Sequence, residues 1–409
     1  MGKNVKKKPN TFLQTMTTFR QKYCNLNFVK QLIFTSNYLK LVSVVLILVD
    51  AILCLVVVHR IKYTEIDWIA YMQEVEGFLN GTFDYSQLKD GGKNVRTAQY
   101  IFVLLYVVLL ALVFRIYIRT KKVPAYVLVL MTCTTYRIHS IFILRLFNDP
   151  IATILFYASL NLFLDNRWSL GSAVYSLAVG VKMNILLYAP ALLIAYLCCL
   201  GWKRTIYQIS ICASVQLFLG APFLLENPYA YLKGSFDLGR IFMHKWTVNW
   251  RFLPEHIFIN PLFHVALLAA HVGLICAFVP IMTAYIKSYA RLKMIETDLN
   301  VQSKKKPMPI DMGSVAQLLV FPMFVTNFIG IVVSRSLHYQ FYVWYYHSLP
   351  YLLWCTELSV KTRLTILGLI ELCWNTYPST DLSSALLHLS HLLLLFNLYK
   401  TSRSRSKME

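Results

Sequence analysis

Two carboxylates stand two residues apart in the polar stretch that follows the first long apolar block of the chain. They are Glu65 and Asp67, and they lie between Tyr63 and Trp68. A carboxylate flanked by aromatic residues near a membrane surface can act as a general base, since a partly apolar wall raises the pKa of a carboxyl group. Two ordinary loop carboxylates have the same spacing, so a general base is one hypothesis and a solvated pair is the other.

Cationic side chains inside or beside apolar stretches form a second set of candidates. They are Arg137, His139, Arg145, Lys182, Arg335 and His338. A charge within an apolar span is costly, which makes each a functional candidate, and several cations near one face suit the anionic head group of a lipid. Snorkelling side chains and buried structural ion pairs explain such residues equally well.

A later polar stretch combines indole, amide and guanidinium groups. Its members are Trp246, Asn249, Trp250 and Arg251. Aromatic faces stack on sugar rings and polar side chains bond to hydroxyls, so this stretch can bind a sugar. An aromatic belt at the membrane interface accounts for the same tryptophans and is the more common explanation.

Other catalytic signatures are absent from the sequence. We find no phosphate-binding glycine loop, dinucleotide fingerprint, nucleophile elbow or zinc-protease motif. The nine cysteines show no zinc or redox spacing, so we expect no metal and no cofactor. Asn80 begins the only Asn-x-Ser/Thr pattern of the chain and is a candidate glycosylation site.

The elements that carry these residues must lie mostly within a bilayer. The 409 residues are 57% hydrophobic and 14% charged, against about 45–50% and about 25% in an ordinary globular chain. This composition excludes a disordered chain, a disulfide-stapled domain and a coiled coil. The net charge of +21 would suggest nucleic acid in a soluble protein. Here the basic residues lie in short stretches between apolar blocks, as the positive-inside rule describes, and we expect no nucleic-acid binding.

The apolar blocks predict an all-α, polytopic membrane protein with about 10–12 transmembrane helices. We place a basic cytosolic tail at 1–40, a membrane domain at 41–399 and a basic cytosolic tail at 400–409. Lumenal loops are expected near 59–97 and 224–261, and 68–79 has the pattern of an amphipathic surface helix. Predicted spans lie at 41–58, 98–118, 123–136, 151–164, 206–223, 262–285, 315–333, 341–355 and 382–398, with two short spans that turn near Lys182 and another short span after 364.

Four stretches together resemble one family. They are residues 64–79, 137–150, 246–252 and 338–345. The family is that of the dolichyl-phosphate-mannose-dependent alpha-1,3-mannosyltransferases, which includes insect members called lethal neighbour of tid. The resemblance implies a lipid-donor glycosyltransferase of the GT-C type in the endoplasmic reticulum membrane. Its substrates would be dolichyl-phosphate-mannose and the five-mannose dolichyl-diphosphate oligosaccharide on the lumenal face.

The resemblance also implies roles for particular residues. The acidic residue that this class uses in its first lumenal loop maps to Asp67 or, as second choice, Glu65. The donor sugar is beta-linked and the product alpha-linked, so transfer should invert the anomeric carbon. We hypothesise that Lys182, Arg335 and His338 stabilise the donor phosphate. The residues expected to contact the acceptor are Trp68, Trp246, Asn249, Trp250 and Arg251.

One stretch departs from the family pattern. After Lys89 the chain lacks a block on the order of two dozen residues in the first lumenal loop. A shortened, catalytically inactive form is therefore one alternative, and a non-enzymatic membrane scaffold or transporter is another. A transporter would be favoured by inverted repeats, which the sequence does not show.

Overall fold

The computed structural model describes residues 25–81, 95–236, 242–302 and 313–406, together with residue 83 and a few positions between 16 and 23. The secondary structure of these residues consists of helices and includes no β-strand. Six helices in the described part are long and apolar enough to cross a membrane, and a bent pair makes a seventh candidate. The six are α3 (Leu39–Arg60), α5 (Val95–Thr120), α10 (Ala189–Glu226), α13 (Pro261–Gln302), α14 (Gly313–Val332) and α17 (Asp381–Ser406).

The bent pair breaks where the sequence places its first cationic cluster. Helix α6 (Ala125–Cys133) is followed by α7 (Tyr136–His139) and the π-helical turn η1 (Ser140–Leu144), and the two halves meet at 52°. Two shorter apolar helices come next, α8 (Asp149–Leu164) and α9 (Trp168–Val181). Such breaks expose backbone groups, which in a membrane must be satisfied by protein or by a water-filled cavity.

The chain breaks at Lys182, as the sequence predicts. Lys182 has extended backbone angles (φ −156°, ψ 124°) and separates α9 from the 3₁₀ helix η2 (Met183–Tyr188). Helix α10 then reverses direction at Gly201, whose φ of +75° is readily adopted only by glycine. The two legs of α10 therefore correspond to the end of the 170–200 block and to the predicted span at 206–223.

The continuous span predicted at 341–355 does not form. The segment instead contains η4 (Tyr339–Trp344), η5 (Tyr346–Ser348) and the short helix α15 (Leu349–Trp354). Nearly all of its side chains are buried inside the protein, so its apolar character reflects protein core and not contact with lipid. The prediction of about 10–12 helices counted this segment, α8, α9 and α16 (Val360–Asn375), which are shorter than a full membrane crossing.

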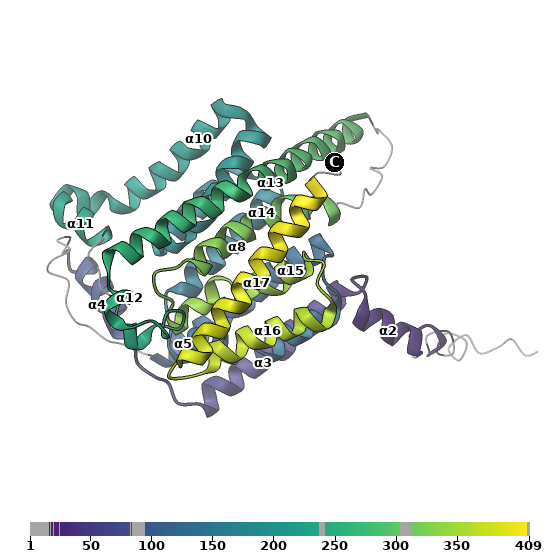
Figure 1. The fold of residues 1–409 in the computed structure, drawn as a ribbon, viewed down its shortest axis with the longest axis horizontal. Helices are drawn as coiled ribbons and strands as arrows, with labels where there is room; N and C mark the ends of the chain where they lie inside the picture. The colour runs from purple at the N-terminus through teal and green to yellow at the C-terminus, as the bar shows by residue number, and fades with distance from the viewer. Residues whose placement is uncertain are drawn as a thin grey trace, which may run out of the picture.

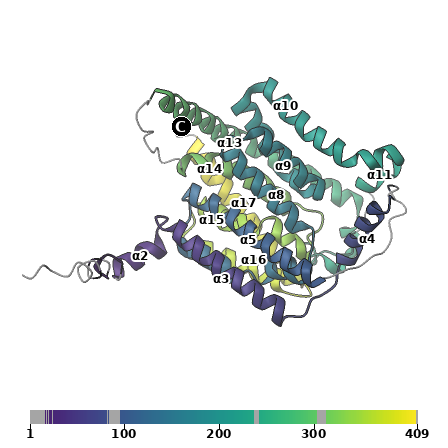
Figure 2. The ribbon, with the colours of Figure 1, turned by 180° about the vertical axis from the view of Figure 1, so that it is seen from behind.

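Helix α14 lies at the centre of the bundle, and 89% of its residues between Val315 and Val332 are buried. In contrast, α3 and α13 expose many large apolar side chains, which is the surface that a bilayer would cover. Figures 1 and 2 show α3, α5 and α8 on one side of the bundle and α13 and α17 on the other.

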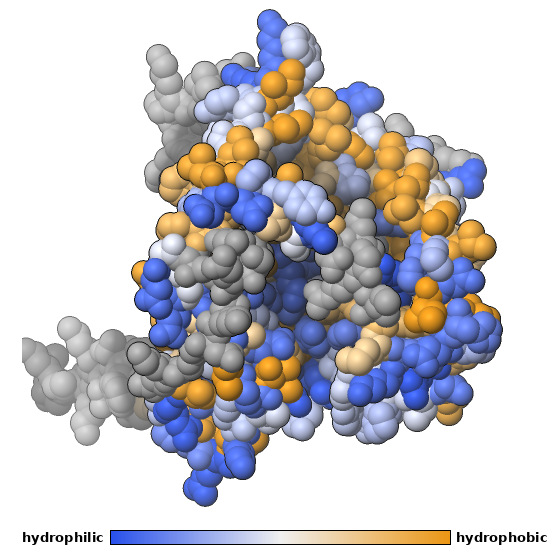
Figure 3. Space-filling model, turned by 90° about the vertical axis from the view of Figure 1, so that its left-hand side faces the viewer, coloured by the Kyte–Doolittle hydropathy of each residue, from blue (hydrophilic) through white to orange (hydrophobic). Residues whose placement is uncertain are grey.

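The short polar helices gather at one end of the bundle. Figure 1 shows α4 (Trp68–Leu79), α11 (Pro228–Ser235) and α12 (Glu255–Phe258) at this end, whereas α2 (Leu26–Phe34) and the end of α17 lie toward the opposite end. Seen from the α4 end, the surface is hollowed near its centre, and hydrophilic residues line the hollow (Figure 3). The described parts of the two long polar stretches therefore share one end of the molecule with this recess.

Candidate active site

The acidic pair lies at the start of α4, in a loop that is tied to the bent span. The backbone amide of Thr64 donates to the carbonyl of Leu144 at 2.9 Å, which fixes the loop against η1. Helix α4 begins at Trp68, so Asp67 occupies the N-cap position. The partial positive charge of the helix amino terminus favours a carboxylate there.

The two carboxylates differ in what they bind. Glu65 is exposed, and its oxygens accept hydrogen bonds from the Tyr63 hydroxyl and from the backbone amide of Ile69. Asp67 is half-buried and makes no capping bond to its own helix. In the described residues its side chain accepts only from the Tyr71 hydroxyl, at 3.3 Å through Oδ2. Asp67 thus keeps one carboxylate oxygen available, and Glu65 does not.

Tyr71 connects Asp67 to a second polar cluster. Its hydroxyl donates to Asp67 and is also hydrogen-bonded by the backbone of Asn148. Burial raises the pKa of the Tyr71 hydroxyl, and the charges of Asp67 and Asp149 raise it further. The hydroxyl therefore remains protonated and acts as a donor at neutral pH.

Asp149 is the centre of that second cluster, and sequence reasoning missed it. It is fully buried at the start of α8. Its Oδ2 accepts from Lys182 Nζ at 2.6 Å, and its Oδ1 accepts from Trp344 Nε1 at 2.5 Å. Lys182 Nζ also donates to Asn148 Oδ1 at 3.1 Å. A buried carboxylate requires such partners, because an unpaired buried charge is strongly unfavourable.

The structure brings the three predicted phosphate-binding residues around one aromatic stack. Phe341 lies between Trp344, at a ring separation of 4.0 Å, and His338, at 5.3 Å. Lys182 Nζ lies 5.4 Å from the centre of the same Phe341 ring. Arg335 reaches the group through Phe242, since its guanidinium lies 4.7 Å from the Phe242 ring, which packs edge-on against His338.

A cavity of about 430 Å³ adjoins this group between η2, α13 and α14. Arg335 and Trp344 line it together with polar groups such as Asn184 and Ser334. Leucines of η2 and α13 supply apolar walls, among them Leu187. An apolar cavity that also contains a cation suits a lipid with an anionic group.

The second polar loop is tied to the segment that carries Arg335 and His338. Asn249 is fully buried, and its amide donates to the carbonyl of Ser334 at 2.8 Å and accepts from the backbone amide of Leu337 at 2.8 Å. Trp250 Nε1 donates to the same Ser334 carbonyl at 2.7 Å. These bonds make Asn249 a tether of the loop, while the acceptor contact expected of it stays a prediction.

The remaining expected acceptor contacts differ in accessibility. Trp246 is 37% exposed, with the Lys245 ammonium 5.0 Å from its ring. Arg251 is half-buried and donates to the carbonyl of His244 at 3.3 Å. In the described part of the chain, the buried Nε1 of Trp68, the residue that follows Asp67, has no hydrogen-bond partner.

A buried group of possible metal ligands lies between α3 and α7. Asp50, Cys54 and His139 place one ligand atom each within 4.8 Å of one another. One Asp50 oxygen accepts from the Tyr106 hydroxyl at 2.7 Å, and the other lies 2.9 Å from His139 Nε2. We interpret this group as a polar link that holds the bent span to α3 and α5.

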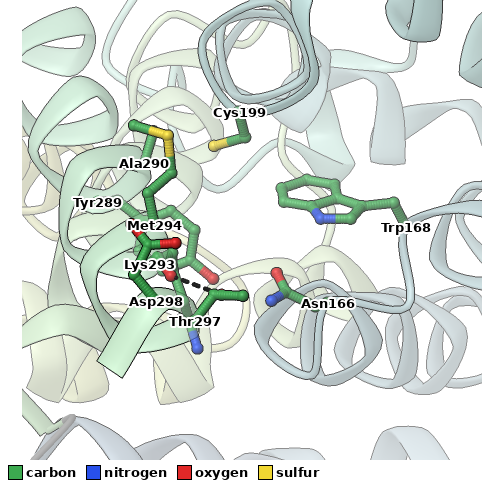
Figure 4. Close-up of a pocket in the computed structure, with 9 residues that line it drawn as sticks. All are labelled: Asn166, Trp168, Cys199, Tyr289, Ala290, Lys293, Met294, Thr297 and Asp298. Atoms are coloured by element: carbon green, nitrogen blue, oxygen red, sulfur yellow. Dashed lines mark hydrogen bonds between the residues drawn. The ribbon is translucent and has the colours of Figure 1, made fainter. Parts of the chain in front are cut away.

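A second cavity, of about 300 Å³, lies along the carboxyl-terminal part of α13 (Figure 4). The side chains of Asn166 and Trp168 face those of Tyr289 and Lys293 across it. Lys293 is paired with Glu296 at 2.9 Å, so its charge is already matched. This cavity lacks the arrangement of base and cations found at the other end of the bundle.

A family model described as ALG3 protein matches residues 44–92 and 87–384. The chain belongs to this ALG3 protein family.

Individual relatives cover nearly all of the chain. A Drosophila melanogaster protein named dolichyl-P-Man:Man5GlcNAc2-PP-dolichol alpha-1,3-mannosyltransferase Alg3 is 46% identical over 97% of this chain and 92% of its own length. A second Drosophila melanogaster protein, named l(2)not2 with the same activity, is 46% identical over 95% of this chain and 96% of its own length. A Mus musculus alpha-1,3-mannosyltransferase of corresponding name is 48% identical over 91% of this chain and 89% of its own length. No solved structure matches the chain.

The family match is divided where the sequence lacks a block. The two matched segments of the ALG3 model meet at residues 87–92. The alignment with the mouse relative is 397 positions long and covers 91% of this 409-residue chain, so about 25 of its positions have no counterpart here. The first loop of this chain is therefore shorter than in members of its family.

Asn80 lies exposed at the carboxyl end of α4. Thr82, which completes the pattern, lies outside the described residues, and modification of Asn80 stays a prediction.

Proposed function

We propose that this chain transfers mannose from dolichyl-phosphate-mannose to Man5GlcNAc2-PP-dolichol and forms an alpha-1,3 linkage. The names of relatives at 46–48% identity support the reaction and both substrates. The observation that carries the proposal is the half-buried Asp67 carboxylate with an unengaged oxygen. Tyr71 links it to the cluster of Asn148 and Asp149, and Trp344, which bonds to Asp149, lines a largely apolar cavity together with Arg335.

Asp67 is the general base of the proposed reaction. It removes the proton from the acceptor 3-hydroxyl as that oxygen attacks the anomeric carbon of the donor mannose. In the family that the chain resembles the donor is beta-linked and the product alpha-linked, so one displacement inverts the configuration. The Tyr71 hydroxyl holds the carboxylate, and the unpartnered Trp68 Nε1 is a donor for an acceptor hydroxyl.

The leaving group is dolichyl phosphate, which departs as an anion. Such a group needs no protonation, so a second carboxylic acid is dispensable, unlike in inverting hydrolysis. Lys182, Arg335 and His338 surround the place where the phosphate would lie and stabilise its charge. Asp149 pairs with Lys182, and Arg335 lines the cavity as a further cation.

The second loop contributes acceptor contacts through Trp246, Trp250 and Arg251, with Asn249 holding the loop in place. The enzyme resides in the endoplasmic reticulum membrane with the α4 end in the lumen and both termini in the cytosol. The basic tails and the separation of α4 from α2 and the end of α17 support this orientation.

Profiling of lipid-linked oligosaccharides tests the function. Cells that lack their own alpha-1,3-mannosyltransferase would express this chain, Asp67→Asn, Glu65→Gln or the control Glu76→Gln, an exposed carboxylate on the same helix. The chain and Glu76→Gln should clear the five-mannose intermediate, and Asp67→Asn should not. If the correctly targeted chain leaves the intermediate in place, the shortened inactive form is the right interpretation. If Glu65→Gln alone fails, Glu65 is the base.

A further inference from the structure

Two arginines of the bent span have no ion-pair partner among the described residues. Arg137 lies on α7, and Arg145 directly follows η1. They lie close enough for their guanidinium charges to repel each other. Among the described residues, neither has a carboxylate within ion-pairing distance.

Arg137 is held in a buried position and does not reach solvent. Only 9% of its surface is exposed, which excludes a snorkelling side chain. Its guanidinium lies 4.8 Å from the centre of the Tyr339 ring, and its Nε, also buried, has no hydrogen-bond partner in the described part of the chain. Glu371 attracts it from beyond ion-pairing distance, and the two Glu371 oxygens accept from Tyr342 and Asn375 at 2.6 Å.

Arg145 is half-buried, and its guanidinium donates to the Ser140 hydroxyl. Several other cations of the fold have a carboxylate partner. Lys182 is paired with Asp149 at 2.6 Å, and Arg115 and Arg119 share Asp165 at 2.9 and 2.7 Å. Arg137 and Arg145 are two like charges with no ion-pair partner among the described residues, and a bound anion would offset their repulsion.

The pair lies next to the candidate active site. Leu144, which precedes Arg145, accepts the hydrogen bond that anchors the loop of Asp67. Tyr339, beneath Arg137, follows His338 in the chain. Arg137 and Lys182 therefore both contact the segment that begins with His338, at Tyr339 and at Phe341.

We propose that Arg137 and Arg145 form a second anion site, which binds the phosphate group of a lipid substrate. Guanidinium groups are the preferred partners of phosphate oxygens, and two of them match the charge of a diphosphate. This inference rests on the proposed function, in which one substrate carries a phosphate and the other a diphosphate. The acceptor diphosphate is the expected occupant, and the donor phosphate is the other source of the same chemistry.

Ligand-induced thermal shifts test the site without turnover. Purified full-length chain, Arg145→Gln, Arg137→Gln/Arg145→Gln and the control Arg204→Gln, an exposed arginine at the turn of α10, would each be heated alone, with dolichyl diphosphate and with dolichyl phosphate. Dolichyl diphosphate should raise the Tm of the chain and of Arg204→Gln, and its apparent Kd should weaken at least tenfold in the arginine variants. Without ligand, Arg145→Gln should be as stable as the parent chain or more stable, because one repelling charge is gone.

Each outcome decides one question. Loss of the dolichyl phosphate shift alone would retain the site and assign it to the donor. Unchanged shifts with both lipids, or a lower ligand-free Tm in Arg145→Gln, would overturn the proposal in favour of a structural role. Because binding needs no catalysis, an inactive chain that still binds dolichyl diphosphate through these arginines would contradict the proposed function and not the site. A parallel increase in KM for the acceptor in the active chain, partly rescued by Arg145→Lys, would support the same assignment.

Discussion

The Lys182–Asp149 ion pair predicts an unequal response to removal of its two partners. Asp149 is 0% exposed, whereas the Lys182 side chain is 25% exposed. Lys182→Met leaves a fully buried carboxylate with Trp344 as a remaining donor, and an uncompensated buried charge costs about 3–5 kcal/mol. Asp149→Asn leaves an ammonium that can extend toward water, and its amide oxygen can still accept from Trp344. We expect that change to cost about 1–2 kcal/mol.

The double variant Lys182→Met/Asp149→Asn separates the pair from its surroundings. Since both charges are removed, it should be more stable than Lys182→Met alone, with a coupling energy of about 1–3 kcal/mol. The assay is thermal unfolding of the four purified proteins in one detergent, with monodispersity checked by gel filtration. A double variant that loses as much stability as the two single changes together would refute the reasoning.

The same four proteins separate stability from catalysis. If Lys182 also stabilises the leaving phosphate, the double variant should regain stability but still transfer mannose slowly. Recovery of the transfer rate together with the Tm would show that Lys182 has only a structural role.

Three further changes have defined expectations. Tyr71→Phe should lower kcat roughly tenfold, because it removes the hydrogen bond to Asp67. The pKa of Tyr71 is raised above its usual 10, so the hydroxyl stays protonated and the loss of kcat should be equal at pH 6 and pH 9. A loss of kcat confined to one pH would contradict this. Asn249→Ala should destabilise by about 1–3 kcal/mol, because the buried amide of Leu337 loses its acceptor, and an unchanged Tm would refute it. Gly330→Ala would place a Cβ 2.5 Å from a methyl of Leu187 at the cavity. It should therefore lower the Tm by an amount equivalent to about 1–3 kcal/mol and raise the KM for the donor. An unchanged Tm and KM would show that Leu187 moves aside freely.

Local patterns predicted the elements that depend on local sequence. The helix at 68–79, the break at Lys182 and the long apolar spans all follow from hydrophobic periodicity and from the cost of a charge in an apolar run. The prediction of a transmembrane span at 341–355 was wrong, because an apolar run has the same composition whether lipid or protein surrounds it. Only the packing of α14 and its neighbours decides between the two.

The residues of the candidate site likewise divide into those that the local sequence identifies and those that only the folded structure identifies. Asp67 and Lys182 were conspicuous because each is a charge in an unusual local setting. Asp149 was not, since an Asp before a Pro at a helix start has an ordinary capping explanation, and its partners Lys182 and Trp344 are 33 and 195 residues away. A signal was present in retrospect: a lysine in an apolar run needs a counter-charge, and the nearest acidic residue at the end of a neighbouring helix is a natural candidate.

The most direct test of the central claim is the transfer rate of purified Asp67→Asn with dolichyl-phosphate-mannose and Man5GlcNAc2-PP-dolichol, measured beside the parent chain. A general base contributes about 10²–10⁴-fold, so the account predicts a kcat at least a hundredfold lower, with a Tm close to that of the parent chain. An Asp67→Asn variant that transfers mannose within tenfold of the parent rate would contradict the assignment of Asp67 as the base.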